Sequence, residues 1–232
     1  MIGIMMLDTR FPRLAGDIGN PGSFSEPPCY RYVTGASVKE VVSDQPIDGQ
    51  LLEKFLDTAI QLEDDGATVI GTSCGFLGSV QEDIESSLNI PFLSSSLILI
   101  PLLRRMFGAQ TQIGVLTFDD SKLGAIHFGG ELDQFIAIHG LSTDSNYRQV
   151  IAADNETLDP ELAQQEVMNV AARCIDHRPE TDLILIECTN LSPWKKQIKT
   201  RFGLPVFDLV DALEWVDKSA PTCQRPDIAD GR

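Results

Sequence analysis

The strongest constraint on the fold is the regular alternation of short apolar runs with segments of helical periodicity along most of the chain. The expected strands are 2–7, 30–34, 68–72, 91–94, 112–118, 134–140, 183–188 and 205–209. The expected helices are 48–62, 80–88, 97–107, 121–128, 160–176, 193–202 and 210–218. Strands that alternate with helices in this way predict parallel α/β sheets with right-handed crossovers.

The second half of the chain repeats features of the first half. Segments 2–8 and 113–119 are apolar runs that end in aspartate, and segments 68–74 and 182–190 are apolar runs followed by a polar turn that carries a cysteine. The spacing between the paired segments is similar in both halves. We therefore predict two pseudo-symmetric, three-layer α/β domains, one of residues 1–96 plus 206–232 and the other of residues 97–205. Ligands of such sheets bind at the carboxyl ends of the strands, so the active site is expected in the cleft between the domains.

Charge and composition narrow the class of partner. The 18 Lys and Arg residues against 34 Asp and Glu give a net charge of −16, which disfavours nucleic acid or an anionic membrane as a partner. No apolar run is long enough to span a bilayer, and the apolar N-terminus lacks the basic leader of a signal peptide. The 5 cysteines include no CxxC pair, which favours a reducing cytoplasm.

The sequence contains no motif that is typical of a zinc site or of a nucleotide-binding site. The three histidines, His127, His139 and His177, are far apart in the sequence and near no cysteine, which argues against a zinc site. Neither GxGxxG after the first strand nor a GxxxxGK[ST] loop occurs, so a nucleotide enzyme is not expected.

Two cysteines stand at corresponding places in the two halves. Cys74 follows the strand 68–72 in a small polar turn, and Cys188 ends the strand 183–188. We expect the two sulfurs to face each other across the cleft, so that a bound substrate meets one thiol on each face. Inversion of a carbon centre by proton transfer needs this arrangement, with one thiolate removing the α-proton and the other thiol donating from the opposite side. A helix that begins after Cys74 would lower the pKa of its thiol.

These residues resemble a known superfamily. Asp8 after the first strand, the turn around Cys74, and Cys188-Thr189 after an apolar strand are similar to the aspartate/glutamate racemase superfamily, whose relatives include hydantoin racemase, maleate isomerase and arylmalonate decarboxylase. The resemblance implies a cleft site, no cofactor and a homodimer. Two departures leave the substrate open: Asn190 stands where glutamate racemases commonly have histidine, and Gly75-Phe76 replace their usual Asn-Thr.

The site residues follow from these motifs. We expect Cys74, Cys188 and Asp8 to be catalytic, with Asp8 orienting a thiol or helping to accept the proton. The residues expected to bind the substrate carboxylate through hydroxyl, amide, guanidinium or backbone N–H groups are Thr72, Ser73, Gly75, Thr117, Thr189, Asn190, Arg10 and Ser94. The Pro- and Gly-rich segment 10–29 is long enough to be a lid or binding loop.

The sequence thus predicts a cofactor-independent isomerase that racemises an aspartate/glutamate-like amino acid or a hydantoin. One alternative is a decarboxylase or a cis-trans isomerase of a small dicarboxylate on the same fold. The other alternative is a non-catalytic protein that binds small anions in the cleft.

Overall fold

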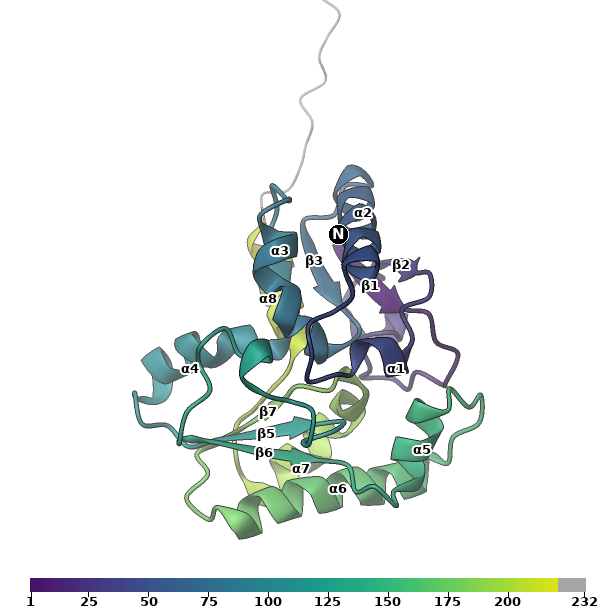
Figure 1. The fold of residues 1–232 in the computed structure, drawn as a ribbon. Helices are drawn as coiled ribbons and strands as arrows, with labels where there is room; N and C mark the ends of the chain where they lie inside the picture. Colours follow the sequence, from purple (N-terminus) through teal and green to yellow (C-terminus); the bar gives the residue numbers. More distant parts are fainter. Residues whose placement is uncertain (221–232) are drawn as a thin grey trace, which may run out of the picture.

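Two parallel β-sheets form the framework of the molecule in this computed structural model, which describes residues 1–220 (Figure 1). The first sheet has the strand order β2-β1-β3-β4, with β1 at Ile2–Leu7, β2 at Cys29–Val33, β3 at Val69–Thr72 and β4 at Phe92–Leu93. The second has the order β6-β5-β7-β8, with β5 at Ile113–Thr117, β6 at Ile136–Gly140, β7 at Leu183–Ile186 and β8 at Val206–Phe207.

Helices connect the strands. The α-helices are α1 (Val38–Val41), α2 (Gly49–Asp64), α3 (Gln81–Glu85), α4 (Ile100–Phe107), α5 (Asn146–Ala152), α6 (Pro160–His177), α7 (Lys195–Phe202) and α8 (Leu209–Ser219). Short 3-10 helices are η1 (Pro21–Ser23), η2 (Gly75–Val80), η3 (Ser96–Leu99), η4 (Ala125–His127) and η5 (Thr189–Trp194). Side-chain caps fix several helix starts: Asp48 accepts hydrogen bonds at the start of α2, Asp159 at the start of α6 and Asp208 at the start of α8.

The first sheet is covered on both faces. Met5 and Leu7 of β1 pack into the core that contains residues of α2, whereas Ile4 and Met6 pack into the core that contains residues of α8. This alternation follows from the two-residue period of a strand, and it makes β1 entirely buried. After β8 the chain leaves the second sheet, and α8 packs against β1 and β3 of the first.

The second sheet is packed closely against α6. A Cβ at Gly114 of β5 would lie 2.5 Å from the Cys174 Sγ of α6, so only glycine fits there. Buried residues of both sheets belong to one continuous hydrophobic core, which joins the two halves. This shared core fixes the position of one sheet relative to the other.

The two sheets share one connectivity. The central pairs are β1–β3 in one sheet and β5–β7 in the other, and the outer strands follow the same order. The prediction of two pseudo-symmetric α/β domains with parallel sheets is confirmed.

Some local expectations are wrong. Segment 121–128 is not a helix: Asp119 accepts hydrogen bonds from the backbone N–H and hydroxyl of Ser121, and Gly124 is extended, which leaves only η4. Helices α1 and α5 have no counterpart among the predicted helices. Cys223, one of the 5 cysteines of the sequence, lies outside the described residues.

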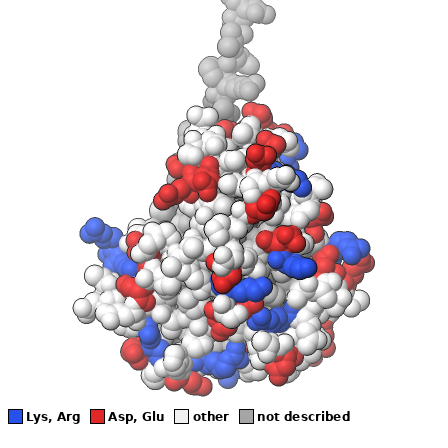
Figure 2. Space-filling view, viewed as in Figure 1, with Lys and Arg blue, Asp and Glu red and all other residues white. Residues whose placement is uncertain are grey.

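Residues 1–220 show neither a membrane-spanning helix nor a metal-binding cluster. No helix in this range is long and apolar enough to cross a membrane. The same range holds no cluster of three or more His, Cys, Asp or Glu side chains suited to a metal ion. Acidic and basic side chains are interspersed over the face shown in Figure 2.

Candidate active site

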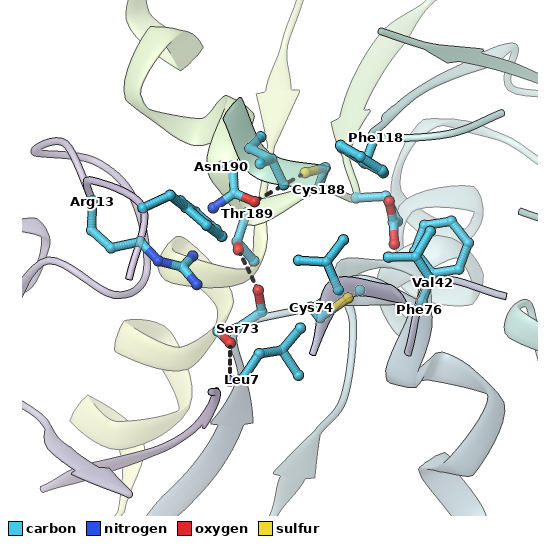
Figure 3. Close-up of a pocket in the computed structure, with 15 residues that line it drawn as sticks. Leu7, Arg13, Val42, Ser73, Cys74, Phe76, Phe118, Cys188, Thr189 and Asn190 are labelled. Atoms are coloured by element: carbon cyan, nitrogen blue, oxygen red, sulfur yellow. Dashed lines mark hydrogen bonds between the residues drawn. The ribbon is translucent and has the colours of Figure 1, made fainter. Parts of the chain in front are cut away.

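Cys74 and Cys188 occupy equivalent turns in the two halves. Cys74 stands two residues after β3 and directly before η2, and Cys188 stands two residues after β7 and directly before η5. Both line one pocket, whose space between atoms, including the solvent at its mouth, is about 360 Å³. Figure 3 shows Cys188 and Cys74 on opposite walls of this pocket.

The pocket is mostly apolar, with few polar groups. It is lined by Leu7, Phe11, Arg13, Val38, Val42, Ser73, Cys74, Gly75, Phe76, Phe118, Ile151, Glu187, Cys188, Thr189 and Asn190. These residues come from both halves of the chain and from the long segment after β1. The pocket therefore lies between the two domains, near the carboxyl ends of the central strands.

Hydrogen bonds hold the two cysteine turns together. Thr189 Oγ1 donates to the Ser73 carbonyl at 2.9 Å, which ties the turn after β7 to the turn after β3. Ser73 Oγ in turn accepts from the Leu7 backbone N–H at 2.9 Å. A second link between the halves runs from Ser96 Oγ to the Ile186 carbonyl at 2.8 Å. The relative position of the two thiols is thus fixed by direct contacts.

Glu187 is a pocket residue that the sequence analysis missed. It is fully buried, and its Oε2 accepts a hydrogen bond of 2.5 Å from Thr117 Oγ1. Its Oε1 has no hydrogen-bond partner within residues 1–220. A Cβ at Gly75 would lie 2.6 Å from the Glu187 carbonyl oxygen and closer still to Oε1, so this position has room only for glycine. A signal was present in the sequence, since a charged residue directly follows the apolar run of β7.

Burial controls the ionisation of these groups. It raises the pKa of Glu187 to about 7, although the hydrogen bond from Thr117 favours the charged form. Burial, with a smaller contribution from Glu187, raises the pKa of the Cys74 thiol to about 12. The same two causes raise the pKa of Cys188 well above its usual value. The expectation of a lowered pKa at Cys74 is therefore wrong, because desolvation outweighs the backbone hydrogen bond from Phe76.

Arg13 brings a positive charge to the pocket. Its guanidinium lies 4.2 Å from the centroid of the Phe11 ring, and it pairs with Asp17 at 3.2 Å and donates to Thr9 at 3.1 Å. A guanidinium has five N–H donors, so these contacts leave donors for a ligand. In Figure 3 the Arg13 side chain points toward Thr189 and Ser73.

The long segment that carries Arg13 is docked on the second half. Asp17 is buried, and it accepts a hydrogen bond from Asn190 Nδ2 at 2.7 Å. A Cβ at Gly16, whose φ is +101°, would lie 2.7 Å from the Pro193 Cα. The segment thus forms one wall of the pocket.

The structure brings together some of the expected site residues and not others. Those that line the pocket are Cys74, Cys188, Ser73, Gly75, Thr189 and Asn190. Those outside its lining are Asp8, Arg10, Thr72, Ser94 and Thr117.

Each residue outside the lining has another partner. Asp8 is exposed and accepts from the Gly35 N–H, and Arg10 is exposed and pairs with Asp154 and Glu156. The buried hydroxyls are used inside the protein, with Thr72 donating to the Ser94 carbonyl, Ser94 to Gln81 Oε1 and Thr117 to Glu187 Oε2. Of these five residues, Thr117 is the one whose hydroxyl donates to the carboxylate of a pocket residue, Glu187, and so affects the pKa of that carboxyl group.

Solved structures share this architecture. Arylmalonate decarboxylase matches with a TM-score of 0.60 at 15% identity, over 94% of this chain and 91% of the other. Allantoin racemase from Klebsiella pneumoniae matches with a TM-score of 0.60 at 16% identity, over 94% and 87%. Aspartate racemase from Picrophilus torridus matches with a TM-score of 0.55 at 15% identity, over 94% and 93%.

The chain has the aspartate/glutamate racemase fold. The resemblance seen in the sequence is confirmed at the level of fold. No family model matches the chain.

Sequence relatives indicate a different reaction. A protein named dimethylsulfoniopropionate lyase from Durusdinium sp. clade D is 28% identical over 221 residues, which are 92% of this chain and 73% of that protein. Dimethylsulfoniopropionate lyases 3 and 7 from Emiliania huxleyi are 27% and 25% identical over 90% of this chain. The chain spans 57% and 64% of these two proteins.

The prediction of an amino-acid racemase, and of an isomerase in general, is therefore wrong. These relatives are lyases, so the alternative of another reaction on the same fold has better support than racemisation. The error has a chemical reason: two thiols beside one pocket are compatible with proton transfer at a carbon atom, but they do not determine what happens to the resulting carbanion.

Proposed function

We propose that the chain is a lyase that cleaves dimethylsulfoniopropionate into dimethyl sulfide and acrylate. The observation that carries the proposal is the similarity to dimethylsulfoniopropionate lyases over 90% or more of the chain. The pocket supports it with a thiol on each of two walls and a guanidinium nearby. Since the chain spans only part of these relatives, substrate and activity are both part of the proposal.

The reaction needs one base and a way to hold the substrate. The substrate has a carboxylate, a Cα that bears the protons made acidic by it, and a Cβ that bears the dimethylsulfonium group. A base takes one proton from Cα, the electron pair of that C–H bond forms the Cα=Cβ double bond, and the Cβ–S bond breaks with its electrons going to sulfur. Dimethyl sulfide and acrylate leave, and the proton stays on the base until solvent takes it.

The pocket residues fit these roles. A thiolate of Cys74 or Cys188 serves as the base, because both sulfurs face the space where a small ligand would lie. Arg13 holds the carboxylate, since guanidinium groups bind carboxylates through paired N–H donors. The neutralised carboxylate then stabilises the negative charge that develops on Cα.

The direct test is product release by the purified full-length chain. Wild type incubated with dimethylsulfoniopropionate is expected to release dimethyl sulfide, measured in the headspace by gas chromatography, together with an equal amount of acrylate. Removing the base, by Cys74→Ala or by Cys188→Ala, is expected to lower kcat by about 100-fold or more.

Cys29→Ser is the matched control, because Cys29 lies on β2 outside the pocket lining. Its kcat is expected to stay within about twofold of wild type, as for most substitutions away from a site. Release of no dimethyl sulfide by wild type, or full activity in both pocket-cysteine variants, would contradict the proposed function.

We also propose a homodimer in a reducing, cytoplasmic compartment. Self-association is supported by large apolar side chains that are exposed on α4 and α8, namely Leu102, Met106, Phe107 and Trp215. The compartment is supported by the four cysteines within the described residues, all of which are free.

A further inference from the structure

One of the two carboxyl oxygens of Glu187 accepts no hydrogen bond from the described residues. Oε2 accepts from Thr117 Oγ1, whereas Oε1 is buried and lacks a hydrogen-bond partner among residues 1–220. A buried carboxylate oxygen without a partner is costly in free energy. A ligand that brings positive charge to this oxygen would remove the cost.

The walls around this end of the pocket are apolar and aromatic. Phe76, Phe118 and Val42 lie on the side of the pocket away from Arg13 (Figure 3), and both phenylalanines are buried. A primary ammonium would need hydrogen-bond acceptors for three N–H groups. An alkylated onium group has no such donors and binds through charge and contact with aromatic faces, so it suits one carboxyl group set among phenylalanines.

We infer that Glu187, together with Phe76 and Phe118, forms the subsite for the positively charged end of the substrate, an onium group with small alkyl substituents. The identity of that group as a dimethylsulfonium rests on the proposed function. The opposite end of the substrate is then the carboxylate at Arg13, and the carbon between the two ends lies beside the thiols.

The charge distribution of the pocket agrees with a zwitterionic ligand. Arg13 and Glu187 carry opposite charges and reach the same pocket from different segments of the chain. The other titratable or charged side chains near the pocket or its aromatic walls are Cys74, Cys188, Asp17, His127, Tyr147, Arg148 and Asp119.

Most of these groups are paired or neutral. Asp17 pairs with Arg13, and Arg148, which lies 5.3 Å from the Phe118 ring centroid, pairs with Asp119 at 2.6 Å. Burial lowers the pKa of His127, which contacts the Phe76 ring edge to face. Glu187 is thus the pocket carboxyl that has no cationic partner within the described chain.

This subsite would couple binding to activation of the base. An onium charge beside Glu187 favours the ionised carboxylate, and it offsets the effect by which ionised Glu187 raises the pKa of the Cys74 and Cys188 thiols. In the free pocket burial keeps these thiols protonated.

An isosteric pair of ligands tests the inference without turnover. 3-(Trimethylammonio)propanoate and 4,4-dimethylpentanoate have the same shape and carboxylate, and they differ in the charge of one central atom. Titration calorimetry at pH 8 on the full-length chain is expected to give wild type about tenfold or greater preference for the ammonium compound. Glu187→Gln is expected to reduce this preference to about twofold or less, while binding of the neutral-tailed compound changes little.

Two further measurements sharpen the test. Wild type is expected to bind the ammonium compound more tightly as pH rises from 6 to 8, because Glu187 loses its proton through a pKa of about 7. Glu187→Gln is expected to lose this pH dependence. Glu85→Gln, which removes an exposed carboxylate on α3, is the control and should behave as wild type.

The outcomes separate this inference from the proposed function. A preference for the ammonium compound that Glu187→Gln abolishes supports the subsite, whether or not dimethyl sulfide is released. Equal binding of the two compounds by wild type overturns it. An unchanged preference in Glu187→Gln also overturns it, and if that variant nevertheless loses lyase activity, Glu187 acts in proton transfer instead.

Discussion

At Glu187 the chain buries an ionisable carboxyl beside two thiols, and this has a cost in stability. The folded-state pKa of Glu187 is about 7, above its ordinary value of 4.5. A carboxyl shifted in this direction contributes its full stability below pH 4.5, and that contribution is lost as pH rises through about 7. Glutamine at this position has no proton to lose.

We therefore expect Glu187→Gln to gain stability relative to wild type as pH rises from 5 to 8. The full shift corresponds to about 3 kcal/mol in the free energy of unfolding. Urea unfolding of both proteins at the two pH values measures this difference, with Glu85→Gln as the control. A stability difference that is the same at pH 5 and pH 8 would show that Glu187 does not titrate in this range.

Part of the site could be predicted residue by residue. The cysteines could be found because each follows an apolar strand in a small polar turn, and Ser73, Gly75, Thr189 and Asn190 adjoin them. Thr72 and Ser94 could not be separated from pocket residues, because a hydroxyl at a strand end either faces the ligand or bonds to the backbone. Only the folded structure shows that they bond to the protein.

At the scale of the elements, the segment between β1 and β2 forms one wall of the pocket. It contributes Phe11 and Arg13 to the lining and is held on η5 through the hydrogen bond from Asn190 to Asp17. Asp17 also accepts from the Gly19 N–H at 2.7 Å, which shapes the turn. The position of Arg13 thus depends on a contact between the two halves.

Asn190→Ala is expected to loosen this segment. Removal of the donor leaves Oδ2 of buried Asp17 with only a long hydrogen bond of 3.5 Å from Arg13, which costs about 1–3 kcal/mol. Hydrogen–deuterium exchange of the amides in residues 9–28 should then be about tenfold faster or more, since local opening becomes easier. Asn89→Ala, in the turn before β4, is the control, and unchanged exchange in the Asn190 variant would show that other contacts hold the segment.

The elements differ in how well sequence predicts them. Strands β1, β5 and β7 are wholly buried, and their continuous apolar runs predict buried strands from the sequence alone. Helices α1 and α5 are short, and their starts rest on the side chains of Ser37 and Ser145 rather than on a long apolar stripe. Such caps are hard to distinguish from turns without the structure.

Across the whole molecule, the repeated connectivity explains why the two thiols meet. Equivalent strands β3 and β7 end at the same level of their sheets, and the shared core fixes one sheet against the other. The sequence predicts this geometry because both halves contain the same pattern of an apolar strand followed by a turn with a cysteine. The proposed reaction depends instead on Arg13, which lies outside the repeat, and on Glu187, which stands where the first half has Ser73.

A crystal structure of the full-length chain with 3-(trimethylammonio)propanoate tests the account most directly. We predict the carboxylate at the Arg13 guanidinium, the trimethylammonium group against Glu187, Phe76 and Phe118, and Cα within contact distance of at least one pocket sulfur. A ligand bound in the reverse direction, or bound elsewhere on the molecule, would contradict it.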